Sequence, residues 1–290
     1  MPNPYFLTFE LIIYIELVLC LRHAWKSGAQ SLLKLLFGAV FGVLLELASI
    51  RQLHAYHYGH FVLMVFDVPL CIGVAWSCII YSAMEFSDAT GLPYFLRPVL
   101  DGLFALNIDL ALDAIAIRLG FWDWGKGLEF QYFGVPYANF WAWFWVIFSF
   151  SLGFRLLARR TDPTGIWLSS PLALIVGLIG VLGTNAMIAF VIPREYYTFS
   201  IAFVIVGALL IVLIKHPALY QRPVDNVAFW IPFINHAYLL IAGLISGVIL
   251  KPPFLLVVSL AMLLIAFALH YPSAKHIFVR LTRGLSGRPA

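Results

Sequence analysis

The 290-residue sequence has few charged residues. Asp, Glu, Lys and Arg together make up 11% of it, against about 25% in a typical soluble domain. Hydrophobic residues make up 62%, and the mean hydropathy is +0.94. This composition excludes an ordinary soluble domain and predicts an all-α, polytopic membrane protein.

Other features are scarce as well. Cys20, Cys71 and Cys78 lie in apolar segments without metal-type spacing, so we expect buried hydrophobic side chains and no disulfides. The first residues lack a basic region and a small-residue cleavage site, so no removable signal peptide is expected. We find no internal repeat, low-complexity tract or soluble domain. Residues 1–290 are therefore predicted to form a single integral membrane helical domain.

The apolar runs predict about nine membrane spans, since a spanning helix needs about 20 mostly apolar residues. The expected spans are 5–22, 33–52, 61–84, 96–118, 137–157, 166–192, 198–215, 227–249 and 253–271. Eight spans are the alternative count. We expect these helices to contact the lipid bilayer directly.

Basic residues set the expected orientation. They concentrate in the first, fifth and seventh connections and in the tail, whereas the even connections are nearly neutral. The residues are Arg22, Lys26, Lys34, Arg155, Arg159, Arg160, Lys215, Arg222, Lys275, Arg280, Arg283 and Arg288. By the positive-inside rule, the N-terminus lies outside and the C-terminus is cytoplasmic, in a multi-pass protein of the cytoplasmic membrane. Nine spans satisfy this alternation and eight do not. The same distribution accounts for the net charge of +4 without nucleic-acid binding.

A set of polar residues falls inside the predicted spans, all in the outer leaflet. Four are carboxylic acids, and each costs roughly 2.5–3.5 kcal/mol to insert near the centre of a bilayer. The set is Glu46, Asp67, Asp109, Asp113 and Asn139. Because the orientation was derived from basic loops alone, their common depth is an independent observation. It favours a functional site.

Asp109 and Asp113 are four residues apart and share one helix face. Two like charges so close in a low dielectric cannot both ionise cheaply, so one should stay protonated near neutral pH. A protonated acid beside a carboxylate or amide that can hold water is a general acid/base pair. The alternative is that these groups only hold helices together by hydrogen bonds. For Asp67, the nearby Pro69 leaves open a purely local role at a kinked backbone.

Two further groups of polar residues are expected to be structural. Arg97 and Asp101, four residues apart, predict a local ion pair at the inner end of the fourth span. Asn185, Asn235 and His236 in the later spans predict hydrogen bonds between helices.

The second connection contains His54, His57 and His60, whose spacing of three could suit a metal. Membrane di-iron hydroxylases need several such histidine boxes, and only scattered histidines remain here. We therefore predict no metal, and expect the loop to line a substrate entrance or position water. Tyr56 and Tyr58 fit that role, or that of anchors at the membrane interface.

Tryptophans cluster around the start of the fifth span. They are Trp122, Trp124, Trp141, Trp143 and Trp145. They could form an aromatic belt at the outer interface. They could also line a pocket for a long apolar polyene, where ring faces stabilise a developing cation.

In combination, these motifs resemble the carotenoid biosynthesis membrane proteins, a family that includes carotenoid hydratases such as the bisanhydrobacterioruberin hydratases. The resemblance covers about residues 42–145. It rests on an ordered set of short motifs: Glu46; Val68-Pro69-Leu70, Ala75-Trp76 and Tyr81; Asp109 and Asp113; Gly120, Trp122 and Trp124; Tyr132-Phe133-Gly134-Val135-Pro136; and Asn139, Phe140 and Trp143.

The sequence departs from the family pattern in three places. Ala114 stands where proline often follows the second aspartate, and Ala142 stands where glycine commonly precedes the tryptophan. The loop after Glu46 reads RQLHAYHYGH where a Gly/Phe/Pro-rich turn is usual. These changes leave the carboxylates intact and bear on the identity of the substrate.

The resemblance implies hydration of a terminal isoprenoid double bond in a linear carotenoid, giving a tertiary alcohol without cofactor or metal. Asp109 or Asp113 would be the acid, and Glu46 and Asn139 would position water or stabilise the cation. The substrate would contact Asp67, Tyr56, Tyr58, His57, Trp122, Trp124, Tyr132 and Trp143. Other enzymes of the carotenoid pathway are candidate partners.

Two other functions remain open. A membrane prenyltransferase of the aspartate-rich type would need a second such motif, with Mg²⁺ bridging a diphosphate, and the later spans lack one. A non-catalytic transporter or carotenoid- or lipid-binding protein should show polar residues in both leaflets.

Overall fold

The computed structural model describes residues 3–53, 56–125, 131–215 and 226–271. This part of the chain is almost entirely helical, as predicted. Its α-helices are α1 (Pro4–Ser27), α2 (Ala29–Leu53), α3 (Leu70–Asp88), α4 (Arg97–Leu119), α5 (Tyr137–Leu157), α6 (Pro163–Ala186), α7 (Tyr197–Lys215), α8 (Asn226–Ser246) and α9 (Phe254–Leu269). Each lies where a span was expected.

Seven of these helices are long and apolar enough to cross a membrane. The other two are α4, whose apolar run is interrupted by several charged residues, and α9, which has 16 residues. Most of α4 is buried against α3, α5, α8 and α9, so its carboxyl groups face other helices. Burial within the bundle explains how α4 can carry charges that a lipid-facing helix could not.

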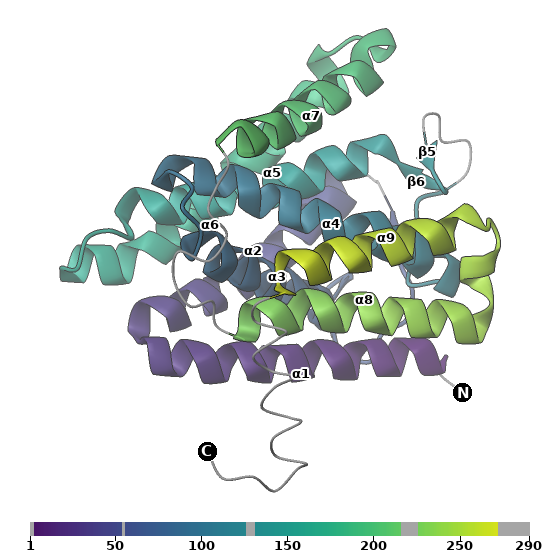
Figure 1. Cartoon of the computed structure of the whole chain (residues 1–290), viewed down its shortest axis with the longest axis horizontal. Coiled ribbons are helices and arrows are strands. Elements are labelled where there is room, and N and C mark those ends of the chain that lie inside the picture. Colours follow the sequence, from purple (N-terminus) through teal and green to yellow (C-terminus); the bar gives the residue numbers. More distant parts are fainter. Residues whose placement is uncertain (1–2, 54–55, 126–130, 216–225, 272–290) are drawn as a thin grey trace, which may run out of the picture.

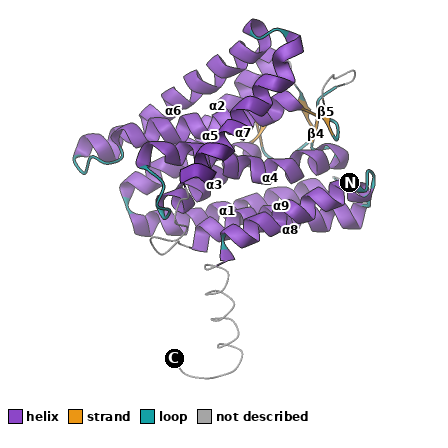
Figure 2. Cartoon of the chain, turned by 45° about the horizontal axis from the view of Figure 1, so that its top comes forward, coloured by secondary structure: helices purple, strands orange, loops and turns teal. Residues whose placement is uncertain are grey.

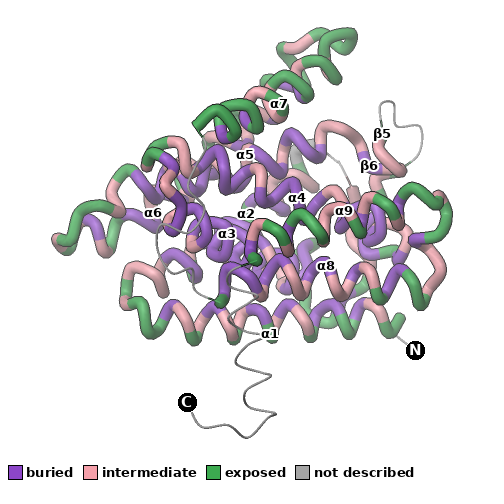
Figure 3. The backbone as a smooth tube through the Cα atoms, in the orientation of Figure 1, coloured by how far each residue is buried: buried purple, intermediate pink, exposed green. Residues whose placement is uncertain are grey.

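The helices form one bundle around α3 (Figure 1). Of the 19 residues of α3, all but four are buried. Helices α1, α2, α4 and α8 all pack against α3. By contrast, α7 lies at the edge of the bundle and is mostly exposed, as the green tube in Figure 3 shows. The exposed residues of α7 are themselves largely apolar, which suits a surface covered by lipid.

Helices α2 and α3 approach each other closely because glycine occupies the contact. A Cβ added at Gly42 would lie 2.7 Å from the carbonyl oxygen of Gly73 and 2.8 Å from the Cβ of Trp76. Small residues allow this approach of helix backbones in membrane proteins. Glu46 lies one turn beyond Gly42, so the contact sets the position of its carboxyl group against α3.

Short antiparallel strand pairs lie at one end of the bundle, called here the strand end (Figure 2). Strands β2 (Met64–Val65) and β3 (Val68–Pro69) form one hairpin, and β5 (Gln131–Tyr132) and β6 (Val135–Pro136) form another. The third pair joins two different loops: β1 (His57–Tyr58) pairs with β4 (Trp122–Asp123). The predicted third span, 61–84, was therefore wrong at its start, because residues 61–69 form a loop and hairpin and α3 begins at Leu70.

The sixth and eighth predicted spans end in helical turns of other types. The sixth span ends as α-helix at Ala186 and continues as a π-helical turn, η2 (Met187–Val191), where Ile192 N donates to Met187 O at 3.0 Å. A short 3₁₀ helix, η3 (Arg194–Tyr196), then leads into α7. The eighth span ends at Ser246, and a 3₁₀ turn, η4 (Val248–Leu250), precedes α9. A third 3₁₀ turn, η1 (Tyr94–Leu96), precedes α4.

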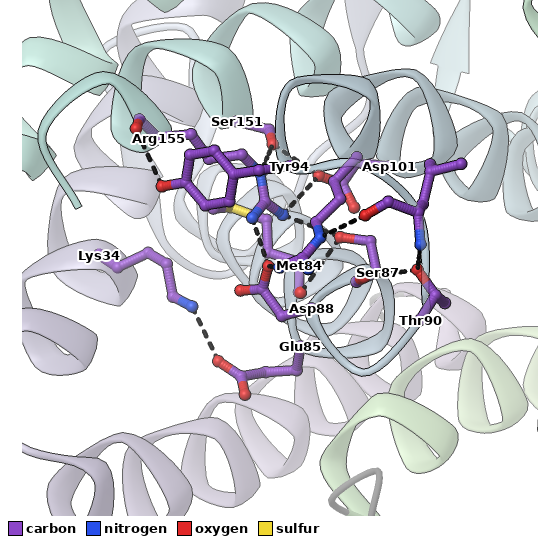
Figure 4. Close-up of polar contacts among 12 residues, drawn as sticks. Lys34, Met84, Glu85, Ser87, Asp88, Thr90, Tyr94, Asp101, Ser151 and Arg155 are labelled. Carbon is purple, nitrogen blue, oxygen red and sulfur yellow. Dashed lines mark hydrogen bonds and ion pairs between the residues drawn. The ribbon is translucent and has the colours of Figure 1, made fainter. Parts of the chain in front are cut away.

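The opposite end of the bundle holds a buried ionic cluster, shown in Figure 4. The guanidinium of Arg155 contacts Asp88, and it reaches Asp101 Oδ2 at 3.1 Å; it also donates to Ser87 Oγ at 2.8 Å. Arg97 binds Asp88 at 2.8 Å and not Asp101. The predicted Arg97–Asp101 pair was therefore wrong. Arg155, from the next helix in the bundle, is the partner that neutralises Asp101.

Candidate active site

A cavity of about 260 Å³ lies at the strand end of the bundle. Its lining is mostly apolar and aromatic, with a few polar side chains. The residues are Phe9, Leu45, Glu46, Ser49, Tyr56, Tyr58, Ile72, Ala75, Trp76, Ile79, Leu112, Asp113, Trp122, Trp124, Pro136, Ala138, Asn139, Ala142, Trp143, Val146, Asn185, Ile188, Ala189 and Tyr197. An apolar cavity with few convergent polar groups is the usual form of a small-molecule site.

Glu46 is buried on α2 and accepts three hydrogen bonds. Trp76 Nε1 donates to Oε1 at 2.6 Å, Tyr58 OH donates to Oε2 at 2.7 Å, and Tyr56 OH also donates to Oε2. Burial, followed by the nearby carboxylate, raises the pKa of both phenols well above the usual range. The phenols thus remain protonated donors. These three donors fix the orientation of the Glu46 carboxyl group as a hydrogen-bond acceptor.

Asp113 and Asp109 share a second arrangement, on α4. The amide nitrogen of Asn139, at the start of α5, donates to Asp113 Oδ2 at 2.6 Å and to Asp109 Oδ2 at 3.0 Å. The two carboxyl groups also lie within hydrogen-bonding range of each other. Two carboxyl groups can hydrogen-bond to each other only if one carries a proton. Of the two, only Asp113 lines the cavity.

Among the described residues, no lysine or arginine lines the cavity. Its two acidic groups are therefore balanced by hydrogen-bond donors and not by cations. The indole N–H of Trp124 is a further donor, and it has no hydrogen-bond partner within the described residues. Trp76 and Trp143 lie together on the wall, with ring centroids 4.3 Å apart. The cavity therefore offers acids, free polar donors and aromatic faces to one ligand.

The structure brings together many of the residues singled out in the sequence. Glu46, Asp113, Asn139, Tyr56, Tyr58, Trp122, Trp124 and Trp143 all line this cavity, and Asp109 reaches it through Asn139. The wall of the cavity beside Glu46 is formed by two loops. One contains β1, which carries Tyr58, and the other contains β4, which carries Trp122. Pairing of these strands fixes the tyrosines beside the tryptophans.

Other residues singled out in the sequence lie away from the cavity. Asp67 is exposed in the β2–β3 turn, where its Oδ2 lies 3.7 Å from Arg51 Nη2. His57 and His60 are exposed, and His54 lies outside the described residues. Tyr132 is half-buried in β5 and donates to Leu110 O at 3.0 Å. Within the described part of the chain, no group of three or more His, Cys, Asp or Glu side chains is placed to hold a metal ion.

Sequence reasoning missed the position of several lining residues, among them Trp76, Asn185 and Tyr197. Trp76 was singled out only as part of a motif, yet its indole donates to Glu46. Asn185 was expected to hydrogen-bond to another helix, but it lines the cavity and no partner for its amide is found among the described residues. Tyr197 carries no sequence signal at all. In contrast, Asn235 does donate to Glu16 at 2.8 Å, and His236 lies 3.2 Å from Asn107 Oδ1.

The fold and the cavity together define a class: a multi-helix bundle of membrane type with an acid site enclosed among apolar and aromatic side chains. A family model described as carotenoid biosynthesis protein matches residues 6–214. The chain therefore belongs to the carotenoid biosynthesis protein family. The match covers α1 to α7 and every residue that lines the cavity. Comparisons with curated proteins and with solved structures give no match.

Proposed function

We propose that the protein hydrates a terminal isoprenoid double bond of a linear carotenoid to a tertiary alcohol. The observation that carries this proposal is a pair of acid groups in an apolar, aromatic-lined cavity whose described lining contains no lysine or arginine. Asp113 lies on one wall with Asp109 behind it, and Glu46 with its three donors lies on another. Addition of water to an alkene needs a proton donor, stabilisation of a cation and a held water.

Asp113 is the proton donor in this mechanism, because it faces the cavity and shares a proton with Asp109. It adds a proton to the less substituted carbon of the double bond and leaves a tertiary carbocation. The resulting carboxylate and the faces of Trp76 and Trp143 stabilise that cation. The amide of Asn139 donates to both aspartates and keeps their carboxyl groups in position during the reaction.

Glu46 acts on the water. Its carboxylate is oriented by Tyr56, Tyr58 and Trp76, so it can accept a hydrogen bond from a water in the cavity. As the water oxygen bonds to the cation, Glu46 takes the released proton. The net change is addition of one water, and the cycle closes when a proton returns to Asp113.

The size of the cavity supports reaction at a chain end. Its volume of about 260 Å³ lies below the roughly 300–1,000 Å³ that hold a whole drug-sized ligand. A long polyene would therefore place only one end inside. The orientation expected from the basic loops puts this site near the outer surface of the membrane.

The proposal is tested by expressing the protein in a lycopene-producing host and measuring pigment masses. Gain of one or two waters is expected, with none in an Asp113→Asn variant that is present in the membrane at the same level. A five-carbon addition would indicate prenyl transfer instead. Unchanged pigment with the wild-type protein, or hydrated pigment with Asp113→Asn, would contradict the proposed reaction.

A further inference from the structure

The cavity reaches the surface of the protein on one side. Among its lining residues only Ala189, in the π-helical turn η2, is exposed. Ser49 of α2 and Ala142 of α5, which also line the cavity, are partly exposed. All three have small side chains. The opening therefore lies where α2, α5 and the end of α6 meet.

Elsewhere in the described lining the residues are less exposed than Ala189. At the strand end, Tyr56 and Trp124 stack edge to face, with centroids 4.6 Å apart, and the β1–β4 pairing ties their two loops together. Toward the middle of the bundle, Ile79 and Val146 are buried. Among the described lining residues Ala189 is the one exposed residue, so we expect a long chain in the cavity to leave it beside Ala189.

The surface around this opening is apolar. Phe190 and Val191, which follow Ala189, are 79% and 72% exposed, and Leu44 of α2 is also exposed. Such side chains on a membrane helix bundle face lipid and not water. The opening therefore connects the cavity sideways with the hydrocarbon of the bilayer.

Two features of the opening point to a ligand. The turn that carries Ala189 is π-helical, a rare conformation that is frequent at functional sites. Just inside, Asn185 is more than nine-tenths buried and lines the cavity, with no hydrogen-bond partner among the described residues. Its amide is therefore available to a ligand in the cavity.

We infer that the gap between Ser49, Ala142 and Ala189 is the portal through which an isoprenoid chain enters the cavity sideways from the bilayer. The chain end passes Asn185 and reaches Asp113, while the rest of the chain stays in the lipid. The amide of Asn185 then faces any water or hydroxyl group at the reacting end. The nature of the ligand rests on the proposed function; the position of the portal rests on the structure.

The test is to narrow the portal. Ala189→Trp places a large side chain in the opening, and Ala186→Trp is the matched control, because Ala186 is exposed nearby and does not line the cavity. Each variant is made in the wild-type and Asp113→Asn backgrounds in a lycopene-producing host. Carotenoid retained per mole of purified protein is measured by absorbance, and hydrated product by mass. Size-exclusion elution in detergent controls for folding.

Ala189→Trp is expected to lower retained carotenoid at least fivefold in both backgrounds, whereas Ala186→Trp leaves it unchanged. Equal retention in Ala189→Trp and Ala186→Trp would overturn the portal, and so would a wild-type protein that retains no carotenoid. Retention without hydration in the wild type would overturn the proposed reaction and leave the portal standing. Hydration by Ala189→Trp at the wild-type rate would overturn the portal alone.

Discussion

The two ends of the bundle handle buried carboxyl groups in opposite ways. At one end Asp88 and Asp101 are neutralised by Arg97 and Arg155 (Figure 4). At the strand end Glu46, Asp109 and Asp113 have no cationic partner in the part of the chain that the structure describes, and they are held by tyrosine, tryptophan and asparagine donors. No cavity-lining residue belongs to the ionic cluster, whereas the acids at the strand end face open space. The comparison distinguishes carboxyl groups that hold helices together from carboxyl groups that can reach a ligand.

The largest effect on activity is expected for Asp113→Asn. Removing a general acid typically costs about 10²–10⁴-fold in rate, so product should fall at least about 100-fold. The free energy of unfolding should hold or rise, because a buried acid next to another acid is removed. Product per mole of folded protein and thermal unfolding in detergent check the two parts. A large loss of stability would show that Asp113 is structural.

The largest effect on stability is expected for Arg155→Met. It leaves Asp101 buried without its cation, and breaking such a pair typically costs about 3–5 kcal/mol. Hydration per mole of folded protein should change less than twofold, because Arg155 is remote from the cavity. Denaturant unfolding in detergent measures the loss. Adding Asp101→Asn should recover part of it; no recovery would mean that the pair is not the cause.

A smaller effect on activity is expected for Tyr58→Phe. Glu46 loses one donor while Tyr56 and Trp76 remain, so we expect roughly a tenfold fall in rate, below the roughly 10²–10⁴-fold that a general acid or base itself contributes. Lys34→Met is the matched change at the other end, since Lys34 binds Glu85 at 2.8 Å. It should leave the rate unchanged. Initial rates of hydration compare the two, and equal rates in both variants would contradict a role for the Glu46 donors.

The smallest effect is expected for Asp67→Asn. Asp67 and Arg51 are both well exposed, and such pairs contribute at most about 1 kcal/mol. Both the product yield and the unfolding midpoint should match the wild type. A clear loss of product would return Asp67 to the site, contrary to its position in the structure.

The sequence predicted the positions of the helices well, because apolar runs of membrane length are a strong signal. It also pointed to Glu46, Asp113 and Asn139, since polar residues are costly in such runs. The sequence-based prediction failed where a residue's binding partner lies on another helix. Asp101 was paired with Arg97 by spacing, but tertiary packing supplies Arg155. Asp67 lay within an apolar run but emerges in a hairpin, since α3 begins only at Leu70.

The portal could not be predicted for a similar reason. Alanine and serine are unremarkable in a membrane helix, and the π-helical turn at Met187–Val191 has no clear sequence signal. Asn185 gained its position only because α6 packs beside α2 and α5 around the cavity. These features depend on which helices are neighbours, and local sequence does not specify that.

The close contact at Gly42 and Gly73 has a consequence for how this protein can vary. Glu46 and its donor Trp76 come from the two helices that meet there. The distance between these groups therefore depends on glycine, which has no side chain, at both positions of the contact. A single methyl group at Gly42 would push α2 from α3 and misplace the carboxylate. A substitution at Gly42, which does not line the cavity, would then abolish activity as completely as the loss of a catalytic carboxyl group.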